Sequence, residues 1–136
     1  MDKLLYIDGE NVSRDIIIDT IDGIKDKLDQ NEKFIGRLYG SREFVKNAIT
    51  PCLIRGVVFV ETSVLSVSKK NVADMKIIID CMCDVSSYCN SSKSCEVFLL
   101  TKDTDFFPLI FKLIELGIDV KTPLLSLTRD DLSQNS

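Results

Sequence analysis

The sequence predicts a single three-layer α/β/α domain built around a five-stranded parallel sheet. Its 136 residues are enough for one hydrophobic core. Segments that look like strands alternate with segments that look like helices along the chain, and the strand segments are nearly continuous apolar runs. Such runs are typical of parallel strands that are covered on both faces. A composition of 45% hydrophobic and 28% charged residues agrees with a packed domain.

The first strand is expected at Lys3–Ile7, an apolar run that ends at the turn-forming pair Asp8-Gly9. A helix follows, because aliphatic residues recur there at intervals of three and four while aspartates occupy the opposite stripe. The residues Asn11-Val12-Ser13 can cap the start of this helix. Its aliphatic stripe consists of Ile17, Ile21, Ile24 and Leu28.

The second strand is expected at Phe34–Tyr39, where Gly40-Ser41 closes it. The next helix begins at Arg42 and is expected to end at Ile49, because Pro51 disfavours helical backbone in the residue before it. The third strand is expected at 56–61. A loop rich in serine and lysine comes after this strand.

The third helix is expected at Val72–Val85, and Ser86–Ser94 is expected to form a polar loop. The apolar spacing of this helix predicts four residues that face the core, namely Met75, Ile78, Ile79 and Met82.

The fourth strand is expected at Cys95–Leu100 and the fifth at Ile118–Thr122. Between them lies a helix at Phe106–Leu116, which Gly117 ends. We therefore predict one domain at residues 1–124 and a polar C-terminal tail at 125–136.

Several classes of function are excluded by the composition. The chain has no histidine and no C-x-x-C pair among its five cysteines, so the usual zinc sites and histidine catalysis cannot be assembled. No apolar run is long enough for a membrane span. Acids at positions 2 and 8 argue against a secretory signal, so we expect a cytoplasmic protein.

Charge is distributed unevenly along the chain. The net charge of −4 argues against a uniformly basic nucleic-acid binder. Residues 1–32, however, carry nine acids and four bases, whereas residues 33–76 carry eight bases and three acids. A region with its own basic bias can meet phosphate.

Carboxylates follow two of the predicted strands. Asp8 ends the first strand, and Asp103 and Asp105 follow the fourth. The functional crevice of an open α/β sheet lies beyond the carboxyl ends of its strands. If strands one and four are neighbours, these acids converge on one volume, which Asp74 at the start of the third helix can also face.

Such a cluster requires a counter-charge, since two carboxylates about 5 Å apart at an effective dielectric near 20 repel by roughly 3 kcal/mol. Oxygen ligands without histidine or thiolate favour Mg²⁺ or Mn²⁺. A divalent cation held by carboxylates can act on a phosphodiester. Alternatively, Asp8-Gly9 is only a turn, and Asp74, Asp103 and Asp105 only cap helices, although two acids exceed what one cap needs.

Three motifs together resemble the NYN family of PIN-like metal-dependent ribonucleases, and they cover nearly the whole chain. They are Tyr6-Ile7-Asp8-Gly9-Glu10-Asn11, Lys69-Lys70-Asn71-Val72-Ala73-Asp74 and Leu99-Leu100-Thr101-Lys102-Asp103-Thr104-Asp105-Phe106-Phe107-Pro108-Leu109. The resemblance implies the strand order 3-2-1-4-5 and an endoribonuclease that cleaves RNA. It also implies that Asp8, Asp74, Asp103 and Asp105 are the metal-binding and catalytic residues.

Residues around these acids receive supporting roles under the resemblance. Asn11 is expected to hold the loop or a metal-bound water, and Thr101 is expected to support the metal ligands. Helix geometry places Asp80 about 120° around the third helix from Asp74, so Asp80 is expected to lie behind the ligands or in solvent. RNA-backbone contacts are expected from five basic residues, namely Lys69, Lys70, Lys102, Arg42 and Arg14.

Two alternatives stay open. Lys102 stands where the family usually has a small residue, so its ammonium either binds phosphate or takes the cation's place in a degenerate RNA- or protein-binding module. A receiver or haloacid-dehalogenase domain fits poorly, because Glu61-Thr62-Ser63 and Asp8-Gly9-Glu10 lack the acids that those folds require. A second copy or another protein is also a possible partner.

Overall fold

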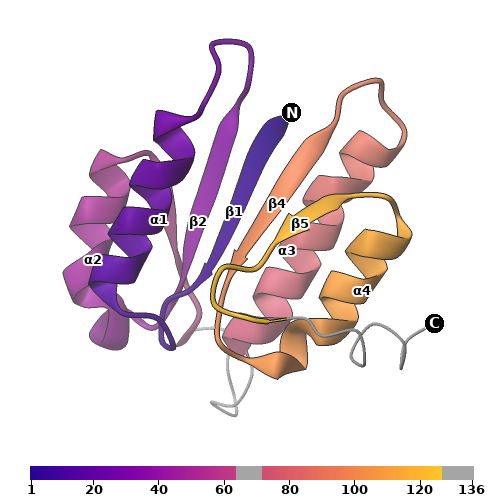
Figure 1. Ribbon diagram of the computed structural model, residues 1–136. Coiled ribbons are helices and arrows are strands. Elements are labelled where there is room, and N and C mark those ends of the chain that lie inside the picture. The colour runs from indigo at the N-terminus through magenta and orange to yellow at the C-terminus, as the bar shows by residue number, and fades with distance from the viewer. Residues whose placement is uncertain (64–71, 127–136) are drawn as a thin grey trace.

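The computed structural model describes residues 1–63 and 72–126. Within them, five parallel strands form one sheet in the order β3-β2-β1-β4-β5, with β1 at its centre (Figure 1). This confirms both the fold class and the strand order that the resemblance implies. The strands are β1 (Asp2–Asp8), β2 (Phe34–Gly40), β3 (Val57–Glu61), β4 (Cys95–Leu100) and β5 (Asp119–Lys121).

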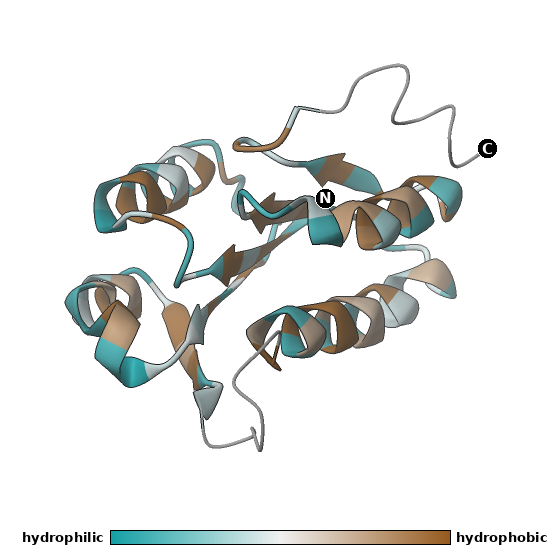
Figure 2. Cartoon of the chain, turned by 90° about the horizontal axis from the view of Figure 1, so that it is seen from below, coloured by the Kyte–Doolittle hydropathy of each residue, from teal (hydrophilic) through white to brown (hydrophobic). Residues whose placement is uncertain are grey.

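Helices cover both faces of the sheet. Helices α1 and α2 lie on one side and α3 and α4 on the other, which gives the three predicted layers (Figures 1 and 2). A short 3₁₀ helix, η2, leads directly into α4. The bounds are α1 (Arg14–Asp26), α2 (Arg42–Ile54), α3 (Val72–Cys89), η2 (Thr104–Phe106) and α4 (Phe107–Glu115).

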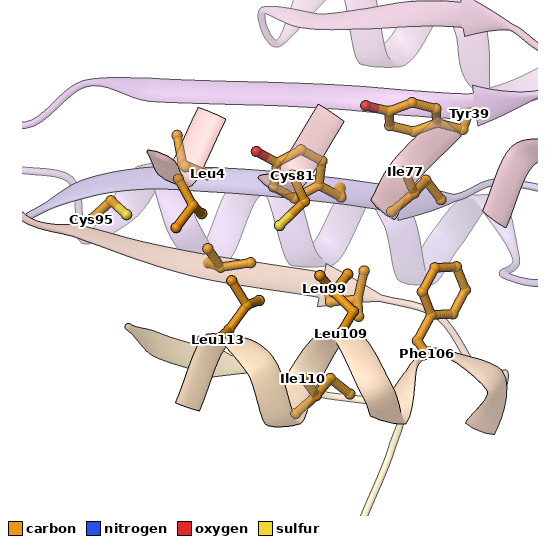
Figure 3. Packing of buried hydrophobic residues seen from close by; sticks show 13 residues of the cluster. Leu4, Tyr39, Ile77, Cys81, Cys95, Leu99, Phe106, Leu109, Ile110 and Leu113 are labelled. Carbon is orange, nitrogen blue, oxygen red and sulfur yellow. The ribbon is translucent and has the colours of Figure 1, made fainter. Parts of the chain in front are cut away.

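The core consists of two apolar clusters, one on each face of the sheet. Successive residues of β1 alternate between them: Leu4 and Tyr6 pack under α3 and α4, whereas Leu5 and Ile7 pack under α1 and α2. Figure 3 shows the first cluster, with side chains of α3 and α4 meeting over the sheet. This alternation is the two-residue period of a strand buried on both faces.

The expected end of the second helix at Ile49 is wrong, because α2 continues through Pro51 to Ile54. A proline inside a helix leaves the carbonyl four residues earlier without its N–H partner. Here that carbonyl belongs to Asn47, and it accepts a hydrogen bond from Arg14 Nε of α1 at 3.1 Å. A neighbouring helix therefore replaces the hydrogen bond that proline removes.

The predicted buried face of the third helix is partly wrong. Met75 and Ile79 are 60% and 53% exposed. The residues that are fully buried are Ile77, Cys81 and Val85, which repeat every four positions. Nearly all sides of α3 carry apolar residues, so periodicity alone does not select the face that packs on the sheet. The helix also continues to Cys89, through the first residues of the expected polar loop.

Polar contacts fix α3 on the sheet. Asp84 accepts hydrogen bonds from the Tyr6 hydroxyl at 2.6 Å and from the Arg37 guanidinium. One turn earlier, Asp80 accepts from the Tyr39 hydroxyl at 2.8 Å. Burial and these carboxylates raise the pKa of both tyrosines, so both hydroxyls stay protonated and act as donors.

The described part of the chain ends against the core. Leu124 packs against the α1–α2 cluster and Leu125 against the α3–α4 cluster. The remainder of the predicted tail, from residue 127, lies outside the described residues. None of the described helices is both long and apolar enough to cross a membrane.

Candidate metal centre

A pocket of about 390 Å³ opens at the carboxyl edge of the sheet, where the loops after β1, β2, β3 and β4 meet the first turns of α2 and α3. Its described lining is strongly acidic, because six carboxylates face the single guanidinium of Arg42. These carboxylates belong to Asp8, Glu10, Glu43, Glu61, Asp74 and Asp103.

Three of the predicted ligands come together. Carboxylate oxygens of Asp74, Asp103 and Asp105 lie within 4.8 Å of one another. Asp74 comes from the first turn of α3, Asp103 from the β4–η2 loop and Asp105 from η2 itself, so segments far apart in the sequence meet here. All three are hard oxygen donors, the ligand type that Mg²⁺ and Mn²⁺ prefer, so the residues present fit a divalent cation.

Asp8 lies at the end of β1 with only 1% of its surface exposed. Its Oδ2 accepts hydrogen bonds from Asn11 Nδ2 and from Thr101 Oγ1, both at 2.8 Å. Burial raises the pKa of Asp8, and these two hydrogen bonds oppose that shift. Among the described residues, no group hydrogen-bonds Oδ1, which leaves that oxygen for a ligand in the pocket.

Thr101 connects the loops that carry these acids. Its buried hydroxyl donates to Asp8 and accepts a hydrogen bond from the backbone N–H of Asp103 at 3.1 Å. Asp103 in turn caps η2, since its Oδ1 accepts from the N–H of Asp105 at 2.9 Å. The cap uses Asp103 alone, so the carboxylate of Asp105 is the surplus acid that the sequence indicates.

Gly9 allows the β1 loop to lie directly on β2. Its N–H donates to the carbonyl of Tyr39 at 2.9 Å. A Cβ at this position would lie 2.7 Å from that carbonyl oxygen and 2.8 Å from side chains of Leu38 and Val45. Any larger residue would therefore push the Asp8 loop away from the sheet.

The neighbouring acids of the cluster contribute to a raised pKa of Asp74. The pKa of Asp74 rises to about 6, first through burial and then through the negative charges of Asp8, Asp103 and Asp105. A carboxylate in this position is costly to ionise while no positive charge lies among the acids. A divalent cation bound by these oxygens would remove that cost.

Of the three residues predicted to support the metal ligands, two contact Asp8 and the third forms other contacts. Asn11 and Thr101 contact Asp8, as described above. Asp80 lies elsewhere on α3 and pairs with Tyr39 and with Lys76, whose Nζ is 3.0 Å from its Oδ1.

The predicted RNA-binding residues also differ in position. Arg42 lines the pocket, with its guanidinium 5.3 Å from the ring centre of Phe59. Arg14 instead bonds the carbonyl of Asn47. Lys102 is exposed and forms no ion pair with a described carboxylate. Lys69 and Lys70 lie outside the described residues.

Two glutamates of the pocket lie outside the predicted set of site residues, although Glu10, two positions after Asp8, is a lower-ranked candidate for the metal shell. Glu10 accepts a hydrogen bond from the backbone N–H of Ser41, and Glu61 accepts one from that of Arg42, each at 3.0 Å. Both therefore cap the first turn of α2. Glu61 ends the third predicted strand. Because functional residues of such folds lie at the carboxyl ends of strands, its position could have identified it from the sequence.

None of the curated proteins compared with the chain matches it. The family model of the NYN domain, in contrast, matches residues 4–135, which is essentially the whole chain. NYN domains are PIN-like and are generally nucleases, and PIN-like nucleases typically use divalent metals. The matched range agrees with the strand order and with the acids at the carboxyl edge, and it confirms the resemblance: the chain belongs to the NYN domain family of PIN-like nucleases.

Proposed function

We propose that this protein is a Mg²⁺- or Mn²⁺-dependent endoribonuclease. One observation carries the proposal: the carboxylates of Asp74, Asp103 and Asp105 gather within 4.8 Å in the chain of a nuclease family. Asp8 lines the same pocket as Asp74 and Asp103. The members of this acidic group repel one another unless a cation neutralises them.

Each acid has a distinct task under this proposal. Asp74, Asp103 and Asp105 hold the cation from α3, the β4–η2 loop and η2, while Asp8 offers its Oδ1 from β1. Asn11 and Thr101 orient Asp8 and favour its ionised form, against the effect of burial, through their hydrogen bonds to Oδ2. When bound, the cation supplies Lewis acidity at the phosphodiester and neutralises the negative charge that develops during hydrolysis.

RNA is the proposed substrate because the NYN family suggests RNA binding. The electrostatics of the pocket support a requirement for metal, since six carboxylates against one guanidinium repel a phosphate backbone. Arg42, on the pocket wall, is proposed to hold a phosphate near the metal. Similar backbone contacts are proposed for Lys69, Lys70, Lys102 and Arg14. Cytoplasmic location and a protein partner stay predictions.

The test is cleavage of an end-labelled single-stranded RNA in Mn²⁺ and in EDTA. Wild type is compared with Asp8→Asn and Asp103→Asn, and with Asp19→Asn on the exposed side of α1 as a matched control. We expect cleavage by wild type and by the control in Mn²⁺ only, and a loss of about 100-fold or more in the two site variants.

A folded wild type that does not cleave RNA in Mn²⁺ would contradict the proposal. The alternative of a degenerate binding module would then be favoured. In that case Lys102→Gly should gain activity, because it restores a small residue next to Asp103.

A further inference from the structure

The pocket continues beyond the acidic cluster to a second wall, formed by the first turn of α2 and the end of β3. Phe44 belongs to this wall, and 74% of its surface is exposed. A phenyl ring so exposed, at the mouth of a polar pocket, stabilises the fold little. Its free face is available to a ligand.

The backbone N–H groups at the start of α2 do not form a phosphate site. Helix N-termini commonly bind anions through free backbone N–H groups. Here Glu10 and Glu61 already accept from the N–H groups of Ser41 and Arg42. Glu43 adds a further negative charge to the same wall. A group that stacks on Phe44 is therefore expected to be uncharged, whereas the guanidinium of Arg42 is left to bind a phosphate of the same ligand.

A hydrogen-bonding group on this wall lacks a partner. The hydroxyl oxygen of Ser41 is buried, and no described residue hydrogen-bonds to it. Buried polar side-chain atoms are nearly always paired in native proteins. Ser41 and Phe44 line the same pocket. Rotation of the Ser41 side chain would turn its covered hydroxyl toward the polar edge of a ligand whose flat apolar face stacks on Phe44.

We infer that this wall is a subsite for one unpaired nucleobase of the RNA, which stacks on Phe44 next to the phosphate held at the acidic cluster. The inference rests on the proposed function and extends it to the structure of the substrate. A base is uncharged and has a π-face and polar edges, which matches the three properties of the wall. Bases within a duplex are stacked on both faces, so the subsite selects single-stranded RNA.

The first experiment uses fluorescence, because the chain contains no tryptophan. Phe44→Trp places one indole in the subsite, and Ile54→Trp places one at the other end of α2, where the replaced side chain is 77% exposed. Each variant is titrated with single-stranded RNA and with the same strand made abasic. Ca²⁺ replaces Mn²⁺, and the RNA is checked afterwards for cleavage.

We expect single-stranded RNA to quench Phe44→Trp, abasic RNA to quench it far less, and neither RNA to change Ile54→Trp. Equal quenching of Phe44→Trp by intact and abasic RNA would show a backbone contact and would overturn the inference.

The second experiment measures the KM for RNA cleavage in Mn²⁺. Phe44→Ala and Phe44→Leu should raise KM about tenfold, since base–aromatic stacking contributes roughly 5- to 150-fold in affinity. Phe44→Tyr should restore the wild-type KM because it keeps the ring. With abasic RNA, the wild type and the three Phe44 variants should have the same KM. Because Phe44 is exposed, these variants should fold normally.

The outcomes separate this inference from the proposed function. A wild type that cleaves RNA with the same KM as Phe44→Ala overturns the base subsite and leaves the nuclease in place. A folded wild type that neither binds nor cleaves RNA in Mn²⁺ overturns both.

Discussion

At the scale of single residues, Asp8 shows how the site is built. It is buried, yet only its Oδ2 is hydrogen-bonded by described residues. A buried carboxylate with one oxygen that has no partner is unfavourable unless a cation binds that oxygen. The hydrogen bonds from Asn11 and Thr101 occupy Oδ2 and leave Oδ1 without a partner among the described residues. Thr101 is central because it also accepts from the N–H of Asp103.

Thr101→Val should lower the affinity for Mn²⁺ about 10- to 100-fold, because it removes both hydrogen bonds while keeping the size of the side chain. Isothermal titration of the protein with Mn²⁺ measures this affinity without relying on cleavage. Thr101→Ser, which keeps the hydroxyl, should bind Mn²⁺ within a few-fold of wild type. Equal affinities in the valine and serine variants would show that the hydroxyl has no part in the site.

The raised pKa of Asp74 predicts how stability depends on pH. Its pKa is about 6 in the folded protein, against an ordinary value of 3.8 in an unfolded chain, so the folded state holds more protons between these values. Metal-free protein should therefore lose stability as the pH rises from 5 to 7. After discounting for solvent screening, we expect a loss of about 0.5 to 1 kcal/mol, or roughly 2 °C in Tm.

Thermal unfolding in EDTA at pH 5 and pH 7 measures this loss. Asp74→Asn is the control, because it lacks the titrating group and should show a smaller fall. Saturating Mg²⁺ should reverse the trend, since the cation binds the ionised carboxylates. The lowered pKa values of Asp2, Glu32 and Glu61 act below about pH 4.5 and stay outside this range. A metal-free Tm that does not fall from pH 5 to pH 7 would contradict the prediction.

At the scale of elements, α2 shows how a neighbour overrides a local signal. Pro51 correctly signals a missing N–H, but the chain continues as helix because Arg14 bonds the free carbonyl of Asn47. The same contact joins α2 to α1. Arg14 therefore has a structural task in addition to the RNA contact proposed for it.

The Arg14 contact can be measured by a double-mutant cycle. Arg14→Ala should lower the free energy of unfolding by about 0.5 to 1 kcal/mol in wild type. In the Pro51→Ala background, Arg14→Ala should lower the free energy of unfolding by a smaller amount. The reason is that the N–H of residue 51 then bonds the carbonyl of Asn47 within the helix. Urea unfolding of the four proteins gives the coupling energy. Lys46→Ala, an exposed change on α2, should be additive with Pro51→Ala. Zero coupling between positions 14 and 51 would contradict this explanation of the helix.

At the scale of the whole molecule, the parallel order brings distant acids together. Because β1 lies beside β4, the end of β1 and the loop after β4 meet at one edge of the sheet. The result is a concentrated negative charge on a protein whose net charge is already −4. RNA cannot approach this edge favourably until the charge is neutralised.

RNA association should consequently depend on divalent cations. We expect fluorescence anisotropy to show at least about tenfold weaker binding of labelled RNA in EDTA than in Ca²⁺ at the same ionic strength. Asp105→Asn removes one negative charge and should reduce the difference between the two conditions. Equal affinity in EDTA and Ca²⁺ would show that the RNA contacts lie away from the acidic cluster.

Much of the fold was predictable from local patterns. The type and order of the elements followed from apolar periodicity, and the carboxyl-edge rule identified Asp8, Asp103 and Asp105 as candidates. The patterns failed where they were ambiguous, as on α3, whose apolar residues lie on most sides. They also missed Glu10 as a cap of α2, because that pairing joins residues 31 positions apart.

The sequence by itself therefore determined the strand and helix order and the family, and it supplied the acids that are proposed to bind a metal. Only the tertiary structure decided that α2 passes Pro51, that Ile77, Cys81 and Val85 face the sheet, and that Phe44 and the acids share one pocket. The physical reason is the sequence distance over which each kind of interaction acts. Periodicity and turn preferences act within a few residues, whereas hydrogen bonds, packing and charge repulsion depend on groups that only the folded chain brings together.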